Sequence, residues 1–132
     1  QDIFISVAAV ADWRVSNAQT QKVKKTGTQS GLDLALTENP DILAEVAALT
    51  QGPWCVGFAA ETEKLAEHAE AKRQRKGIPL LVGNIGPLTF GQDDNALLLV
   101  DAEGVRELPR APKLQLAREL VAEIAARLLQ AR

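Results

Sequence analysis

Three lysines and one aspartate near the start of the chain are spaced so that they could handle a phosphate group. Lys22, Lys24 and Lys25 are followed by Gly27 and Gly31, in a polar stretch that begins at Asp12. Lysine ammonium groups contact phosphates as point charges, and a loop flanked by glycine can move to cover a ligand, so the pattern suits transient phosphate binding. A run of solvated charge is the alternative interpretation of the same lysines.

Two further places could contact an anion or a base. The run Asn39-Pro40-Asp41 predicts the start of a helix, because asparagine caps, proline suits the first turn and aspartate favours the positive end of the helix dipole. Backbone N–H groups there could bind a phosphate or a base edge, and simple capping is the alternative. Lys72 and Lys76 are one helical turn apart and could approach one anion, although a solvated helix end explains them as well.

The remaining candidates for chemistry are a single histidine and a single cysteine. Neither His68 nor Cys55 has a second histidine or cysteine at ligand spacing, so a zinc site is not expected. His68 is predicted to lie on the surface, and Cys55, early in an apolar run, in the core. The sequence contains no dinucleotide-binding glycine fingerprint, phosphate loop or nucleophile elbow.

The elements that must position these residues alternate between strands and helices. Apolar runs predict strands at residues 3–9, 32–37, 54–60, 79–83, 96–100 and 105–108. Helical spacing predicts helices at residues 42–49, 63–76 and from Pro112 onward. The apolar face predicted for the last helix consists of Ala117, Leu120, Val121, Ile124 and Leu128. Residues 12–30 lack periodicity and predict a long loop, a length typical of a lid or binding loop.

This alternation predicts an α/β protein with a Rossmann-like three-layer fold, a largely parallel central sheet and a C-terminal hairpin. The first strand, residues 3–9, is predicted to be covered on both faces, and the strand at 32–37 to have one buried face. In open sheets of this type, ligands bind outside the carboxyl ends of the strands. Asp12, Glu61 and Asn84 each follow a predicted strand, so we expect them to converge there.

Composition narrows the class of protein. The 132 residues suffice for one domain with one core, and 46% apolar with 24% charged residues is ordinary for a globular protein. A net charge of −2 disfavours a general binder of nucleic acids or membranes, and no apolar run is long enough to span a bilayer. One cysteine favours a reducing compartment, so a cytoplasmic protein is expected. The start at Gln1 and the lack of methionine suggest a fragment of a longer polypeptide.

Five segments in order carry a family resemblance: AAVADWR with KVKK, then NPDIL, VGFAAET, a helix ending in KRQRK, and DDNALLLV. Together they resemble the C-terminal part of bacterial phosphopantothenate–cysteine ligase, the synthetase half of the bifunctional coenzyme A biosynthesis flavoprotein. The resemblance covers residues 1–132 as a single, incomplete domain. The family's N-terminal part, with a Gly-rich first turn and a Ser-Asn-x-Ser-Ser-Gly-Lys-Met-Gly segment, has no counterpart here, so the chain alone is expected to be inactive.

The resemblance implies a CTP-dependent ligase. The carboxylate of 4′-phosphopantothenate would attack the α-phosphate of CTP, and cysteine would displace CMP from the acyl-cytidylate to give 4′-phosphopantothenoylcysteine. The resemblance also implies Mg²⁺ bound with CTP and a homodimer, with no nucleic acid or membrane partner. FMN is expected only in a possible decarboxylase domain of the parent chain.

The resemblance also assigns residues to the site. Lys22 would be the loop lysine that covers the phosphates and supports the second half-reaction. The nucleotide-binding residues would be Ser6, Val7, Ala8, Asp12, Lys22, Pro40, Asp41, Ile42, Leu43, Phe58, Lys72 and Lys76. No residue is assigned as a metal ligand. Two departures stand out: Trp13 replaces the family's usual tyrosine, and Gly83-Asn84-Ile85 replaces an Ala-Asn-Asp run.

Two other functions are considered. A Rossmann-like nucleotide-binding or regulatory module without catalysis would account for the missing N-terminal segment and for Ile85. An NAD-dependent oxidoreductase is suggested by fold analogy alone, and the sequence lacks its glycine fingerprint.

Overall fold

The computed structural model describes residues 1–18, 33–61, 65–85 and 91–131. These residues fall into two compact units. The larger unit combines Gln1–Val7 with Ile42–Arg132, and the smaller unit is Ala8–Asp41. Lys22, Lys24 and Lys25 lie outside the described residues.

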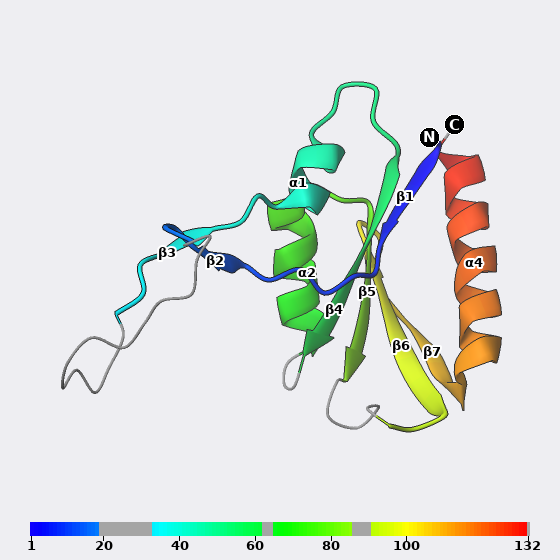
Figure 1. Ribbon diagram of the computed structural model, residues 1–132. Helices are drawn as coiled ribbons and strands as arrows, with labels where there is room; N and C mark the ends of the chain where they lie inside the picture. Colours follow the sequence, from blue (N-terminus) through cyan, green and yellow to red (C-terminus); the bar gives the residue numbers. More distant parts are fainter. Residues whose placement is uncertain (19–32, 62–64, 86–90, 132) are drawn as a thin grey trace. The chain divides into compact units, whose positions relative to one another are not determined.

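A five-stranded sheet forms the centre of the larger unit, in the order β1-β4-β5-β6-β7 (Figure 1). Its strands are β1 (Ile3–Ser6), β4 (Trp54–Glu61), β5 (Leu80–Ile85), β6 (Asp94–Asp101) and β7 (Gly104–Pro112). The first three are parallel, and β6 and β7 form an antiparallel hairpin on β5. The predicted α/β fold, with its largely parallel core and C-terminal hairpin, is confirmed.

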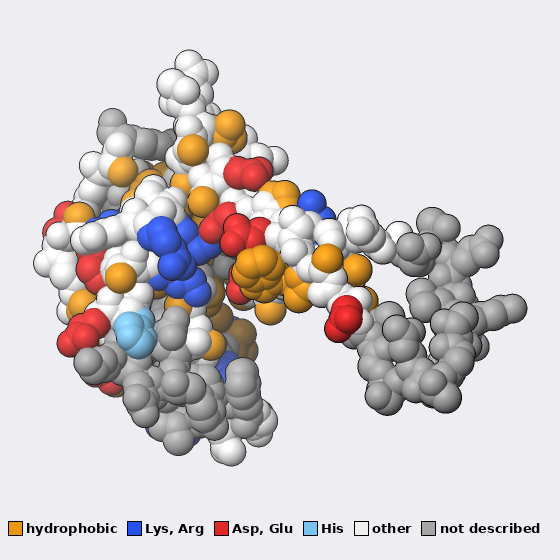
Figure 2. Space-filling model, turned by 90° about the vertical axis from the view of Figure 1, so that its left-hand side faces the viewer, with side chains coloured by type: hydrophobic (Ala, Val, Ile, Leu, Met, Phe, Trp, Pro, Cys, Tyr) orange, Lys and Arg blue, Asp and Glu red, His pale blue; other side chains and the backbone are white. Residues whose placement is uncertain are grey.

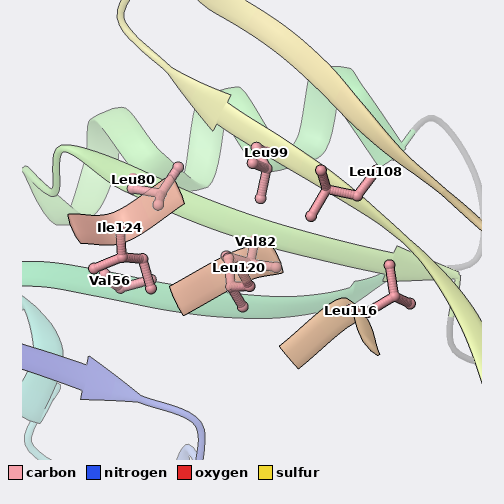
Figure 3. Close-up of a cluster of buried hydrophobic side chains, with 8 residues drawn as sticks. All are labelled: Val56, Leu80, Val82, Leu99, Leu108, Leu116, Leu120 and Ile124. Carbon is pink, nitrogen blue, oxygen red and sulfur yellow. The ribbon is translucent and has the colours of Figure 1, made fainter. Parts of the chain in front are cut away.

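Helices cover both faces of this sheet (Figure 1). The helices α1 (Ile42–Ala47) and α2 (Leu65–Lys76) lie on one face, and α4 (Lys113–Gln130) lies on the other. Buried side chains divide accordingly into two clusters, because successive residues of a strand point to opposite faces. The α1 and α2 side buries Leu43, Cys55, Ala59, Ala69, Ile78, Leu81 and Val100. The α4 side buries Val56, Leu80, Val82, Leu99, Leu108, Leu116, Leu120 and Ile124 (Figure 3).

The hairpin and α4 are also joined by a network of charges. Arg127 of α4 donates to Asp101 of β6 at 3.0 Å and to Glu123 one turn earlier, and Arg106 of β7 donates to Glu123 at 2.6 Å. Burial alone would raise the pKa of Asp101, but Arg127 and the backbone N–H of Glu103 outweigh it and hold that pKa below its ordinary value. The hydrogen bond from Arg127 likewise lowers the pKa of Glu123.

Two expectations about burial are corrected, one for β1 and one for α4. The strand β1 ends at Ser6 rather than at residue 9, and Ile5 is 41% exposed, so β1 is not covered on both faces. On α4, Leu116 is buried, whereas Val121, predicted on the buried face, is 63% exposed. Both differences have one cause, which is that β1 is an edge strand and α4 extends past it.

The smaller unit is a two-stranded antiparallel ribbon formed by β2 (Trp13–Val15) and β3 (Leu36–Glu38). The prediction of a continuous loop from residue 12 is therefore wrong at its start. The predicted strand at 32–37 is displaced toward residue 38, and its expected buried face is absent among the described residues, since Leu34 and Leu36 are both exposed. A ribbon of two short strands has no second layer of its own to bury them.

Asn39, just after β3, forms hydrogen bonds with residues around the start of β2 and does not cap a helix. Its amide donates to the carbonyl of Ala11 at 2.6 Å, its backbone N–H donates to Asp12 at 2.8 Å, and its side-chain oxygen accepts from Arg14 at 3.0 Å. The helix α1 begins only at Ile42. In the described part of the chain, no helix is long and apolar enough to cross a membrane.

Candidate functional site

The strand β1 ends beside the middle of its neighbour β4, and the residues at this point form the candidate site. Ser6, the last residue of β1, pairs with Gly57, whereas β4 continues to Glu61. The chain therefore leaves the sheet at Val7 while its neighbour strand runs on. Ser6 is half-buried and Val7 is exposed. Both were predicted to contact a nucleotide, and both lie at this exit.

Gly57 allows α1 to approach the same point. A Cβ on Gly57 would lie 2.7 Å from Ile78 Cδ1, 2.9 Å from Leu43 Cδ2 and 2.9 Å from Leu81 Cδ1, closer than real Cβ contacts. Only glycine leaves room there for the first turn of α1 against β4. Gly57 thus brings Leu43 next to the end of β1. Sequence analysis missed this residue, although a glycine inside an apolar strand is a signal of close backbone approach.

The predicted residues of α1 present different groups to a ligand. Leu43 is 7% exposed and its side chain belongs to the core, so only its backbone could contact a nucleotide. Ile42 is half exposed and could contact a base with its side chain. If both residues bind cytidine as predicted, Ile42 would use its side chain and Leu43 only its backbone.

The second half of α2 concentrates positive charge, and Figure 2 shows basic side chains gathered on this side of the molecule. Arg73 is engaged by Glu70 through two hydrogen bonds of 2.8 and 2.9 Å, which lower the pKa of Glu70. Lys72 is half-buried and has no ion pair or hydrogen bond with another described residue. Lys72 is therefore not held by a described partner as Arg73 is, and Lys76 lies one turn further along.

The expected convergence at the carboxyl ends of the strands is confirmed for β4 and β5. Asn84 of β5 pairs with Ala60 of β4, and Glu61, the last residue of β4, pairs with Ile85. Asp12, the third residue of that expectation, belongs to the smaller unit. From the end of β4, α2 runs back toward the start of β5, where Arg73 donates to the carbonyl of Ile78 at 3.2 Å, so Lys72 lies partway along this return.

Phe58 lies on the other face of the sheet. Its side chain packs against the buried cluster under α4, while α1 and α2 cover the opposite face. The structure therefore does not bring Phe58 together with Lys72 and Lys76 on one face. Phe58 and Gly57 are consecutive residues, so a ligand at the sheet's edge could still reach both.

The remaining predicted residues belong to the smaller unit. Ala8, Asp12, Pro40 and Asp41 are all exposed there. The Asn39 hydrogen bonds hold Asp12 beside the Pro40-Asp41 segment within that unit. These residues, separated by more than twenty positions in sequence, are therefore neighbours within the smaller unit.

The single cysteine and the single histidine occupy the kinds of position predicted for them. Cys55 is buried, and burial raises the pKa of its thiol, which agrees with the predicted core role. His68 is exposed, also as predicted. Among the described residues, no group of three His, Cys, Asp or Glu side chains is placed to hold a metal ion.

An open hollow of the larger unit does not coincide with these residues. It is an open depression of about 490 Å³ at the amino ends of the strands, lined by Gln51, Trp54, Pro79 and neighbouring residues. The charge that could recognise a phosphate lies on α2 instead. The fold defines an α/β protein with a mostly parallel core sheet, and the candidate site residues of the larger unit lie at the end of β1, in the first turn of α1 and on α2.

Comparison with known proteins agrees with this class. The model of the family described as "DNA/pantothenate metabolism flavoprotein C-terminal domain" matches residues 1–128. The chain belongs to this family. This confirms the resemblance on which the sequence-based expectations were built.

The relatives of known name are proteins of coenzyme A biosynthesis. The chain is 43% identical over 132 residues to "Coenzyme A biosynthesis bifunctional protein CoaBC" of Escherichia coli (strain K12), covering 96% of this chain and 32% of the relative. The protein of the same name from Haemophilus influenzae is 42% identical over 125 residues, covering 92% and 31%. The chain thus spans about a third of the length of these relatives.

A solved structure, "Crystal structure of the C-terminal Domain of Coenzyme A biosynthesis bifunctional protein CoaBC", matches with a TM-score of 0.73 and 28% identity. The match covers 98% of this chain and 56% of that chain. A flavoprotein from Streptococcus pneumoniae shares the fold, with a TM-score of 0.73 at 18% identity, over 96% of this chain and 63% of that one.

Proposed function

We propose that this chain is the nucleotide-binding part of a CTP-dependent phosphopantothenate–cysteine ligase acting in coenzyme A biosynthesis. The observation that carries the proposal is the family match over residues 1–128 to the C-terminal domain of pantothenate-metabolism flavoproteins. The nucleotide would lie beside the end of β1 and the first turn of α1, with its phosphates toward the cations of α2.

The chemistry explains why such a site is needed. A carboxylate is a poor acyl donor until one of its oxygens becomes part of a good leaving group. Transfer of a cytidylyl group to 4′-phosphopantothenate, with release of pyrophosphate, achieves this. The amine of cysteine then attacks the acyl carbon, CMP leaves, and the amide forms. The protein must hold the reacting oxygen in line with the α-phosphate and neutralise the triphosphate charge.

The residues divide these tasks. Ser6 and Val7 would form a rigid wall beside the nucleotide, because the sheet fixes the end of β1. Lys72 and Lys76 would bind phosphate oxygens, and Ile42 with the backbone of Leu43 would contact the base. The proposal assigns Lys22 to the triphosphate and the second half-reaction.

Mg²⁺ is proposed to arrive with CTP. The ion usually keeps several waters and binds substrate phosphates more than protein side chains, so a dedicated cage of carboxylates is not required. Its contribution would be to neutralise phosphate charge. Any FMN of the parent protein would belong to a separate decarboxylase domain.

A homodimer is also proposed. Trp13, Val15 and Leu36 leave the small β2–β3 ribbon with exposed apolar side chains, an arrangement that favours burial against another protein surface. A second copy of the chain is the partner that the resemblance implies. A cytoplasmic location would supply CTP, cysteine and reducing conditions for Cys55.

Calorimetry with the intact domain tests the nucleotide. The domain can be made by placing this chain in the aligned segment of the Escherichia coli relative, which it matches over 132 residues. With Mg²⁺ present, we expect CTP to bind at least about tenfold more tightly than ATP, a difference of about 1.4 kcal/mol. Equal affinities, or no binding, would contradict the proposal. Formation of 4′-phosphopantothenoylcysteine by the same chimera would exclude a non-catalytic regulatory module.

A further inference from the structure

Arg14 of β2 is a cation to which the proposed nucleotide site gives no role. It follows Asp12 and Trp13, in a segment that was predicted to contact the nucleotide. Its Nη1 donates to the backbone carbonyl of Glu38 at 2.7 Å and to Oδ1 of Asn39 at 3.0 Å. Glu38 ends β3 and Asn39 follows it, so one side chain of β2 binds two consecutive residues at the end of the opposite strand.

The guanidinium of Arg14 fixes the orientation of the Asn39 amide. Oδ1 of Asn39 accepts from Arg14, while Nδ2 donates to the carbonyl of Ala11 at 2.6 Å. With the amide reversed, its NH₂ group would face the guanidinium and its oxygen would face a carbonyl, so both hydrogen bonds would be lost. Arg14 therefore favours the one orientation in which Asn39 binds Ala11.

Pro40 explains why a side chain makes this hydrogen bond. The ribbon has three residue pairs, and the backbone N–H of Asn39 adds a hydrogen bond to the carbonyl of Asp12 at 2.8 Å. Proline has no backbone N–H, so residue 40 cannot donate to the opposite segment. The Asn39 side chain supplies a further donor in its place. A ribbon of this size is marginally stable in water, so losing a hydrogen bond at its end lets the two segments separate.

The two segments joined in this way both carry predicted nucleotide-binding residues. Asp12 lies in one segment, and Pro40 and Asp41 lie in the other. The smaller unit begins at Ala8 and ends at Asp41, so these are also the segments by which the chain enters and leaves that unit. A ligand that contacts both segments binds more tightly when they are already held together, because ordering them on binding costs conformational entropy.

We propose that Arg14 and Asn39 are positioning residues of the nucleotide site. Arg14 orients the Asn39 amide, and that amide holds the two segments together before CTP binds. This role rests on the proposed function. It differs from the role that residue type alone suggests for Arg14, which is direct contact with a phosphate, because Nη1 already donates to two carbonyl oxygens of the ribbon.

A double-mutant cycle in the chimera with the Escherichia coli relative tests this role. Arg14→Ala and Asn39→Ala should each weaken CTP binding in calorimetry by about 3- to 10-fold, the effect of losing one hydrogen bond. In the ligase assay, the KM for CTP should rise and the KM for cysteine should not. Because Arg14 acts through Asn39, the double variant should lose about as much affinity as Asn39→Ala alone. Losses that multiply would show direct contact between Arg14 and the nucleotide, and would overturn the proposal.

Ser16→Ala is the matched control. Oγ of Ser16 donates to the carbonyl of Ala35 at 2.9 Å across the same ribbon, at the end away from Asp12. We expect this variant to bind CTP like the parent. If the general stability of the ribbon decided the affinity, Ser16→Ala and Asn39→Ala would lose equally, and that result would also overturn the proposal.

Hydrogen exchange without CTP tests the contacts separately from the proposed function. The backbone N–H of Asn39 should exchange at least about threefold faster in Arg14→Ala than in the parent, because its hydrogen bond to Asp12 opens more often. An unchanged rate would overturn the role of Arg14. Faster exchange in this variant, together with a parent that binds no CTP, would instead overturn the proposed function and with it the site that Arg14 serves.

Discussion

The cations of α2 differ in what surrounds each of them. Arg73 is held by Glu70 through two hydrogen bonds, and its guanidinium also donates to the carbonyl of Ile78. It therefore fixes the end of α2 against the start of β5. Lys72, the preceding residue, has no such partner among the described residues. Residue type alone cannot separate these two roles, since both are long cationic side chains in one basic run.

Lys72→Ala should weaken CTP binding to the intact domain by about 10- to 100-fold, the cost of one charge-assisted hydrogen bond to phosphate. Arg75→Ala is the matched control, because Arg75 is an exposed cation on the same helix. If only the general positive field of α2 mattered, both variants would lose affinity equally. Calorimetry with CTP and Mg²⁺ distinguishes the outcomes, and equal losses would remove Lys72 from the site.

At the scale of elements, the Arg127 network fixes α4 to the β6–β7 hairpin. Asp101 and Glu123 are 15% and 20% exposed at their side chains, so Arg127 neutralises two carboxylates that are largely removed from water. Exposed pairs contribute little because water screens them, whereas breaking a mostly buried pair leaves a desolvated charge. No local pattern singles out Arg127, because its partner Asp101 lies at the end of β6, 26 residues earlier in the chain.

Arg127→Ala should destabilise the protein at neutral pH by about 2 kcal/mol, measured by urea unfolding. The carboxylates have lowered pKa values in the folded state, so their stabilisation is complete above their unfolded pKa values of about 4. It is lost as the pH falls through the folded values. The difference between parent and variant should therefore shrink below about pH 4.

Arg110→Ala is the control for this prediction. Arg110 pairs with Asp94 on the same hairpin at 2.6 Å, but both side chains are well exposed. Its removal should have a much smaller effect at neutral pH. A loss from Arg127→Ala no larger than that from Arg110→Ala, or one that is constant from pH 7 to pH 3, would contradict the account of the network.

For the molecule as a whole, the two units bury apolar surface very differently. The larger unit has a core on each face of its sheet, whereas the β2–β3 ribbon leaves Trp13 and Leu36 more than half exposed. A two-stranded ribbon is marginally stable in water on its own. The proposed dimer would give this ribbon the layer that it lacks.

Leu36→Glu should therefore shift the intact domain from dimer to monomer in light scattering, because each interface would bury a carboxylate. Leu114→Glu changes a leucine of α4 that is more exposed still, and it should leave the dimer intact. A Leu36→Glu variant that stays dimeric, or a parent domain that is monomeric at micromolar concentration, would exclude the ribbon as the interface.

The sequence by itself determined the elements and the family. Apolar runs of strand length and helical spacing identified β1, β4, β5 and the hairpin as well as α2 and α4, because burial in layered sheets imposes those periods. The order of five motifs identified the family, which the match over residues 1–128 confirms. The neighbouring ends of β4 and β5, with Glu61 and Asn84, were also expected from the sequence.

Only the tertiary structure decided which of these residues share a face and which surfaces stay open. It showed that Gly57 admits α1, that Phe58 lies on the face opposite Lys72, and that Val121 is exposed beside an edge strand. The reason is physical. Periodicity records which residues can be buried together, but what covers them depends on strand order and on neighbours distant in sequence, which no local pattern contains.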